Sequence, residues 1–193
     1  RRGASDDETV KRYIFTSDRL GFRNWMKEDI AILSELNTDK EVMKYFPATQ
    51  TKEQTVLFIE RMQQEFEEKS YCYFAVETLH NQELIGFIGI HEQTFEADFT
   101  PCVDIGWRLK RSAWNQGFAS EGAKRVLQYA FNELKLDAIY SIAPEINLPS
   151  ENVMKKIGMK KLRTFDFSLL KDNRLKSCVL YQITKEMYDQ QTC

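Results

Sequence analysis

Hydrophobic and polar residues follow two different periods along this chain, and the changes between the periods mark its elements. Alternation with period two predicts strands over residues 71–77, 83–91 and 102–109, because successive side chains of a strand point to opposite faces. Residues 80–82 form a turn-like polar segment, so the first two of these strands are expected to pair antiparallel. Further strands are expected at residues 19–23, 138–143, 159–168 and 175–184.

Apolar residues that recur at every third or fourth position predict helices between these strands. One such stripe occupies residues 30–36. Thr51 and Gln54 have the spacing of a capping box, which predicts the start of another helix. Further helices are expected at residues 39–44, 117–134 and 150–157. Gly158 follows the last of them at the position where helices commonly end in a left-handed residue.

The order of these elements predicts one α/β domain. We expect a mixed, largely antiparallel sheet of six or seven strands, with helices on both faces and one parallel crossover through the helix at 117–134. The chain has 193 residues, of which 42% are hydrophobic, enough for a single domain with a sizeable core. Because the chain opens on a charged stretch, residues 1–16 are expected to form a loose extension before a domain at 17–193.

Charge and composition exclude several classes of function. Lys plus Arg total 27 and Asp plus Glu total 29, so the net charge of −2 gives no support for a nucleic-acid partner. The chain has only two histidines, and its four cysteines form no CxxC pair, so no metal site is expected. No apolar stretch is long enough to cross a membrane and no signal sequence is present, which together predict a cytoplasmic protein without a membrane partner.

The segment from Val103 to Met159 carries the candidate chemistry. Its strand leads through a turn into a helix at Gln116-Gly117-Phe118-Ala119-Ser120. The first N–H groups of a helix lack internal partners and carry partial positive charge, and small residues would let a diphosphate approach this backbone closely. The alternative is purely structural: Gly117 permits a tight turn and Ser120 helps to cap the helix.

Three motifs in this order resemble the GNAT superfamily of acyl-CoA N-acyltransferases. They are Asp-Ile-Gly-Trp (104–107), Trp-Asn-Gln-Gly-Phe-Ala-Ser (114–120) and Asn-x-x-Ser-x-x-Val (147–153), the last followed by Lys-Ile-Gly-Met (156–159). More narrowly, the chain resembles the ribosomal-protein N-terminal alanine acetyltransferases, which also fit Asp-Arg-Leu-Gly-Phe-Arg (18–23) and Glu-Val-Met-Lys-Tyr (41–45). The resemblance covers residues 17–184.

The resemblance implies a site for acetyl-CoA, used as a cosubstrate without a metal. The family's pyrophosphate loop falls on residues 114–119, with Trp114 in place of the usual Gln or Arg, a replacement that this branch often shows. The implied cofactor-binding residues are Trp107, Arg108, Leu109, Gln116, Gly117, Phe118, Ala119, Ser120 and Asn147. Residues 107–109 would use backbone groups freed where the central strands part, and one N–H there could polarise the thioester carbonyl. The simpler role for Trp107, a core aromatic, is compatible with this one.

The resemblance also proposes Ser150 as the acid that protonates the departing CoA thiolate. Ser150 equally occupies a position where a serine would cap a helix, so both roles stay open. For the base that deprotonates the amine, the candidates are Asp104 on the cofactor strand and Glu92 or His91 at the end of the preceding strand. Each of these could instead be an ordinary surface group.

The expected reaction is direct acetyl transfer to a primary amine in a ternary complex. The acceptor is either a small molecule or a peptide N-terminus, and the protein a monomer or a homodimer. An α-amine of pKa about 7.8 is far more often neutral at pH 7 than a lysine of pKa about 10.4, which favours either an easily deprotonated amine or a base that acts through water. The corner at Tyr45-Phe46-Pro47 is a candidate acceptor wall. The alternatives are a non-catalytic acyl-CoA sensor on the same fold and a protein-interaction domain.

Overall fold

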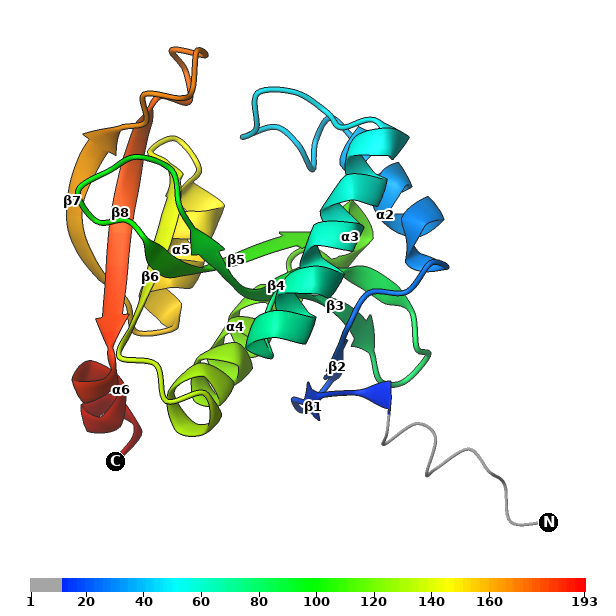
Figure 1. Ribbon diagram of the computed structural model, residues 1–193, viewed down its shortest axis with the longest axis horizontal. Coiled ribbons are helices and arrows are strands. Elements are labelled where there is room, and N and C mark those ends of the chain that lie inside the picture. The colour runs from blue at the N-terminus through cyan, green and yellow to red at the C-terminus, as the bar shows by residue number, and fades with distance from the viewer. Residues whose placement is uncertain (1–11) are drawn as a thin grey trace.

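The computed structural model describes residues 12–193, and its centre is one eight-stranded sheet (Figure 1). The strands follow the spatial order β1-β2-β3-β4-β5-β6-β8-β7, so the N-terminal and C-terminal strands lie at opposite ends of the molecule. Their bounds are β1 Phe15–Thr16, β2 Leu20–Arg23, β3 Tyr73–Thr78, β4 Leu84–Gln93, β5 Cys102–Leu109, β6 Ala138–Pro144, β7 Lys160–Asp166 and β8 Ser177–Thr184. The β5–β6 pair is parallel and the other neighbours are antiparallel.

Helices cover both faces of this sheet, as the sequence predicts. Their bounds are α2 Asp29–Thr38, α3 Lys52–Lys69, α4 Phe118–Gln128, α5 Leu148–Lys156 and α6 Lys185–Thr192, with the π-helical segment η2 Tyr129–Glu133 continuing α4. Phe87 of β4 packs on Phe58 of α3 with the ring centroids 5.3 Å apart. Its neighbour Ile88 packs beside Gly122 of α4. Because consecutive strand residues face opposite ways, α3 and α4 lie on opposite faces of the sheet.

Two sequence predictions at helix ends are confirmed. Thr51 and Gln54 form the complete capping box at the start of α3. Gly158 follows α5 with φ of +90°, the left-handed conformation expected where a helix ends.

The helix predicted at residues 39–44 is wrong, because this segment forms a series of turns. The Asp39 side chain accepts a hydrogen bond from the Glu41 N–H at 3.0 Å. Such a local side-chain bond offers the backbone an alternative to the helical pattern. The turns carry Tyr45 and Phe46 to the site described below.

The sheet has one strand more than the sequence predicts, because β1 forms within the expected loose extension of residues 1–16. Residues 1–11 lie outside the described part of the chain. From Tyr13 onward the chain packs: Tyr13 and Phe15 are buried, and the Tyr13 hydroxyl donates to Glu77 at 2.7 Å. A strand of two residues is too short to show an alternating pattern, so β1 could not be predicted.

A buried ion-pair network joins the first strands to α2. The Arg23 guanidinium donates to both Asp29 oxygens, at 2.7 and 2.9 Å, and to Glu77 of β3. All three side chains are at most 4% exposed.

Replacing Arg23 with alanine is expected to lower the free energy of unfolding by about 3–5 kcal/mol, because the buried Asp29 carboxylate loses its charged partner and Glu77 keeps only Arg12 and Tyr13. Arg111→Ala is the matched control, since it breaks an ion pair with Asp39 in which Arg111 is 58% exposed. The control should lose little stability, because exposed ion pairs contribute little. Urea unfolding of both variants measures the difference, and equal losses would contradict this account.

Candidate active site

The sheet opens at its centre, between the parallel strands β5 and β6. These strands share a single register pair, Asp104 with Tyr140. Just beyond it, the Ser141 hydroxyl donates to the Ile105 carbonyl at 3.0 Å. By contrast, β5 is paired with β4 along its whole length, from Cys102 to Leu109. The gap therefore runs alongside the second half of β5.

The backbone of Trp107 faces this gap. The Lys110 N–H donates to the Ile85 carbonyl of β4 at 2.8 Å, whereas the Leu109 carbonyl accepts from the Trp114 indole at 2.9 Å. Backbone groups of successive strand residues point alternately to the two sides of the strand. Residues 105, 107 and 109 thus direct their N–H and C=O groups away from β4, and those of Trp107 point into the gap.

Arg108 behaves differently from the two residues with which the resemblance groups it. The same alternation directs its backbone groups toward β4, where it is paired with Phe87. Its side chain, and not its backbone, reaches the site. The expectation that all three backbones of residues 107–109 face the cosubstrate is therefore corrected at Arg108.

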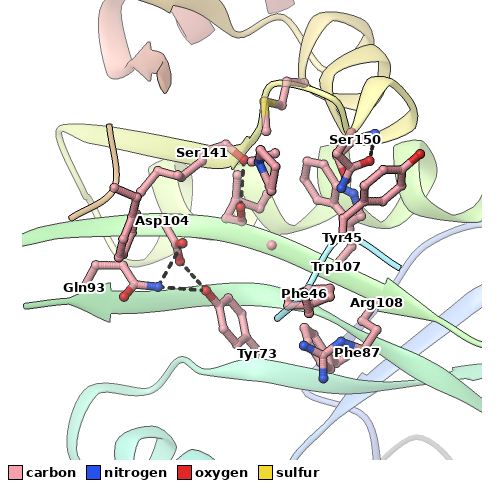
Figure 2. Close-up of a pocket in the computed structure, with 18 of the residues that line it drawn as sticks. Tyr45, Phe46, Tyr73, Phe87, Gln93, Asp104, Trp107, Arg108, Ser141 and Ser150 are labelled. Atoms are coloured by element: carbon pink, nitrogen blue, oxygen red, sulfur yellow. Dashed lines mark hydrogen bonds between the residues drawn. The ribbon is translucent and has the colours of Figure 1, made fainter. Parts of the chain in front are cut away.

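A cavity of about 270 Å³ lies at this opening (Figure 2). Residues of β3, β4, β5 and β6, the start of α5, and three loops that are distant in sequence form its walls. The loop residues include Tyr45 and Phe46, so this predicted corner does line the site. The other lining residues are Tyr73, Phe87, Gln93, Phe95, Asp104, Ile105, Gly106, Trp107, Arg108, Ser141, Ile142, Ala143, Pro144, Asn147, Ser150, Met154 and Phe167.

Asp104 is a buried carboxylate on the wall of this cavity. It accepts hydrogen bonds from the Tyr73 hydroxyl at 2.6 Å and from the Gln93 amide at 3.1 Å, as Figure 2 shows. Burial raises the pKa of Asp104 to about 6, although both hydrogen bonds act in the opposite direction. The carboxylate is therefore mostly ionised at pH 7, and its raised pKa makes it a better proton acceptor than an ordinary aspartate.

The other predicted base, Glu92, lies elsewhere. Its carboxylate forms an ion pair with Lys69 at the end of α3, and it does not line the cavity. The neighbouring His91 Nδ1 is hydrogen-bonded to Glu65 at 2.7 Å, also on the α3 side. Of these candidates, only Asp104 is brought to the site.

Ser150 lines the cavity, and it is not the cap of its helix. The N-cap of α5 is Asn147, whose side chain accepts the Ser150 N–H at 3.2 Å. The interpretation of Ser150 as a cap is therefore wrong: the helix begins earlier than residue 150, so its first-turn donors are met by Asn147. Within residues 12–193 the Ser150 hydroxyl has no hydrogen-bond partner and is free to face a ligand.

The start of α4 has the features expected of an anion site. Gly117 is its N-cap with φ of +78°, and no side chain caps the helix, so the proposed capping by Ser120 is not found. Within the described chain, the N–H groups of residues 116–120 donate to no protein acceptor. A side chain at Gly117 would be strained by this φ value.

Arg19, just before β2, lies beside this turn and was not predicted from the sequence. Its guanidinium nitrogen lies 3.6 Å from the position that a Cβ on Gly117 would occupy, and the guanidinium carbon lies 4.3 Å from the centre of the Phe118 ring. Arg19 also pairs with Glu121 at 2.7 Å. Arg19 is part of a motif that carried the resemblance, but no sequence pattern places it beside a helix so far along the chain.

The Arg108 side chain is the second feature that the sequence did not reveal. Its guanidinium carbon lies 4.3 Å from the centre of the Phe46 ring and 5.1 Å from that of Phe87 (Figure 2). One nitrogen donates to Asn37 at 2.9 Å, while Nε is buried without a partner among residues 12–193. Burial lowers the pKa of Arg108 to about 10, so it remains cationic at neutral pH.

Comparison with known proteins establishes the family. The model of the acetyltransferase (GNAT) domain matches residues 19–160, well over half of the chain. This chain belongs to the GNAT acetyltransferase family. It is 31% identical over 175 residues to the uncharacterized N-acetyltransferase YnaD of Bacillus subtilis (strain 168), an alignment that covers 90% of this chain and 98% of YnaD.

Solved structures confirm the GNAT fold. The crystal structure of a GNAT-family acetyltransferase from Bacillus anthracis matches with a TM-score of 0.75 and 29% identity, covering 89% of this chain and 98% of that one. Spermidine N-acetyltransferase from Vibrio cholerae, in complex with CoA and spermine, matches with a TM-score of 0.71 over 88% of this chain and 98% of that one. At 18% identity this second likeness concerns the fold alone.

GNAT acetyltransferases use acetyl-CoA or CoA, and the residues of this chain fit such a ligand. The opening beside Trp107 offers unpaired backbone groups for an extended amide-containing arm, and the uncapped start of α4 offers N–H groups for a diphosphate. Among residues 12–193, no group of His, Cys, Asp and Glu side chains is arranged to hold a metal ion. Nor does any helix in that range have the length and apolarity needed to cross a bilayer.

Proposed function

We propose that this GNAT acetyltransferase transfers an acetyl group from acetyl-CoA directly to a primary amine in a ternary complex. The observation that carries the proposal is the meeting, in one cavity, of the Asp104 carboxylate and the gap that the Trp107 backbone faces. A base for the amine and a donor for the thioester carbonyl would then stand on one strand. The amine and the thioester would meet between them.

The N–H groups at the start of α4 would hold the diphosphate, with Arg19 adding positive charge at the same turn. The arm of the cosubstrate would enter between β5 and β6, where the strands leave backbone groups unpaired. The Trp107 N–H would then donate to the thioester oxygen and stabilise the charge that grows there as the amine attacks.

Asp104 would remove the proton that the amine loses. The amine nitrogen forms a bond to the acyl carbon, the carbon–sulfur bond breaks, and the sulfur leaves as a thiolate. With a pKa of about 6, Asp104 is matched better to an α-amine of pKa about 7.8 than to a lysine of about 10.4. An α-amine is also what the ribosomal-protein N-terminal alanine acetyltransferases, which the motifs resemble, acetylate.

Ser150 would donate a hydrogen bond to the departing thiolate and pass it a proton, which the serine would regain from water. The assignment rests on its place in the cavity and on the absence, within the described residues, of another partner for its hydroxyl. A thiolate of pKa near 8.5 is a fair leaving group, so the help that it needs is modest.

Ser150→Ala is expected to lower kcat about tenfold while the free energy of unfolding changes by less than about 0.5 kcal/mol. Asn147→Ala is the control for the helix start, because removing the actual cap should cost about 1 kcal/mol. Stopped-time kinetics and urea unfolding on both variants separate the two roles. A Ser150 variant that loses stability and keeps full turnover would show a structural serine.

The function as a whole is tested by measuring CoA release with a thiol reagent over a panel of primary amines. Amine-dependent release with formation of the N-acetyl product supports the proposal. Tight CoA binding without turnover on any amine would show a non-catalytic acyl-CoA sensor instead. A melting temperature that does not respond to CoA would contradict both, because ligand at 100 times its Kd stabilises by about 2.7 kcal/mol.

A further inference from the structure

Arg108 brings a cation into the cavity and has no counter-ion among residues 12–193. A guanidinium has five N–H donors, and Arg108 uses one of them, toward the neutral Asn37 side chain, among residues 12–193. Its Nε is buried and unpartnered, and two aromatic rings cover the group. Burying a charge without a partner is costly unless a ligand supplies what the protein omits.

The charges that line the cavity form a pair of opposite sign. Asp104 is the acidic side chain among the lining residues and Arg108 the basic one. They stand four residues apart on β5, so both project from the same face of the strand. Tyr73 and Phe87, whose rings are stacked with centroids 5.2 Å apart, lie between them: Tyr73 bonds to Asp104 and Phe87 lies under Arg108.

We propose that the acceptor is an amino acid in the broad sense, a small molecule or terminal residue that carries a carboxylate close to its amine, and that Arg108 binds this carboxylate. The inference rests on the proposed function, since Asp104 takes the amine end. A carboxylate meets the N–H edge of a guanidinium through two parallel hydrogen bonds, which would satisfy the unpartnered Nε. A polyamine would instead bring a second positive charge toward Arg108.

The spacing along β5 limits the size of the acceptor. Phe87 is the cross-strand partner of Arg108, so the guanidinium stays level with its own position on the strand. Two groups four residues apart on a strand are separated by roughly 10–13 Å, allowing for lean of the side chains. After a hydrogen bond at each end, roughly 3–6 Å remains between the amine nitrogen and the carboxylate carbon. That range fits β-alanine and 4-aminobutyrate, whereas an α-amino acid, at about 2.5 Å, lies at its lower edge.

The test compares acids with their uncharged amides as acceptors for acetyl-CoA. The panel is glycine, β-alanine, 4-aminobutyrate and glutamate, each beside its amide, with spermidine as the polycation. We expect the best acid to exceed its amide in kcat/KM by about 10- to 100-fold, the contribution of a hydrogen bond to a charged group. Arg108→Gln should remove that preference without changing the Kd for CoA. Arg111→Gln, on an exposed arginine just beyond β5, should keep it.

If the enzyme acetylates none of these amines, a binding measurement still tests the inference. With CoA present, the N-acetyl form of each acid should raise the melting temperature of the wild type and not that of Arg108→Gln. Equal kcat/KM for acids and amides overturns the inference while leaving acetyl transfer to amines intact, and so does faster transfer to spermidine. Faster transfer to an uncharged amine from succinyl-CoA than from acetyl-CoA overturns it as well, since Arg108 would then bind the acyl group. Absence of any Arg108-dependent shift in melting temperature has the same effect.

Discussion

Asp104→Asn is expected to lower kcat/KM by about 10²- to 10⁴-fold, the range that a positioned general base contributes. The asparagine keeps the size of the side chain and can still accept the hydrogen bond from Tyr73, so loss of proton acceptance is the main change. Steady-state kinetics of CoA release measure the effect. Glu92→Gln is the matched control, because Glu92 pairs with Lys69 away from the cavity and should change kcat/KM less than about threefold.

The pH profile gives this prediction its sharpest form. The proton acceptor must be ionised, so the wild type should lose activity as the pH falls through the Asp104 pKa of about 6. Below the pKa of the free amine, protonation of the amine alone lowers kcat/KM tenfold for each pH unit. In the wild type the slope of log kcat/KM should therefore steepen from one to two below about pH 6. In Asp104→Asn it should remain one, and an unchanged break near pH 6 would contradict the assignment of Asp104 as the base.

The same variant should be more stable than the wild type at neutral pH. The folded-state pKa of Asp104 is raised above its ordinary value, so ionising this carboxylate opposes folding as pH rises through about 6. Removing the charge should add about 2 kcal/mol at pH 8, after allowance for weaker hydrogen bonding, and little at pH 4. Urea unfolding at the two pH values checks this. If Asp104→Asn is more stable and less active than the wild type, the Asp104 carboxylate serves catalysis and not folding.

Gly117→Glu is expected to raise the Kd for CoA by more than about 100-fold. The residue has φ of +78°, which a side chain rarely adopts, and a carboxylate there would repel the diphosphate at the start of α4. Isothermal titration with CoA measures the affinity. Gly117→Ala separates backbone strain from charge, because it adds the strain and little else. Unchanged affinity in the glutamate variant would refute the assignment of this turn.

The sequence predicted the parts of the site that follow one another along the chain. Small residues at 117 and 119 predicted an open helix start, and alternation placed Asp104 and Trp107 on a central strand. It did not predict the parts that packing brings together. Tyr73 and Gln93 reach Asp104 from other strands, and Phe46 reaches Arg108 from a loop. A strand period assigns a face to a side chain and says nothing about what lies across from it.

One wrong prediction and one alternative that is not realised have local causes. The segment after α2 has a short run of residues that suit a helix, but the Asp39 side chain bonds to the backbone two residues ahead and favours turns. Ser150 stands in a position typical of a cap, but Asn147 and Pro149 start the helix earlier, so the serine is moved into the first turn. In both places, side chains at the predicted helix start determine whether and where a helix begins, which the hydrophobic periodicity alone does not specify.

Because β5 and β6 separate, a ligand bound between them would contribute to the hydrogen bonding of the sheet. Most of the length of two neighbouring strands lacks the ladder that joins the rest of the sheet, so strands β1–β5 and β6–β8 meet across a seam with few mutual bonds. An acyl donor seated in that seam would act as a short additional strand. With the donor bound as proposed, the reactant consumed in each turnover would also bridge the two halves of the sheet, and the sheet would be interrupted again when the thiol product leaves.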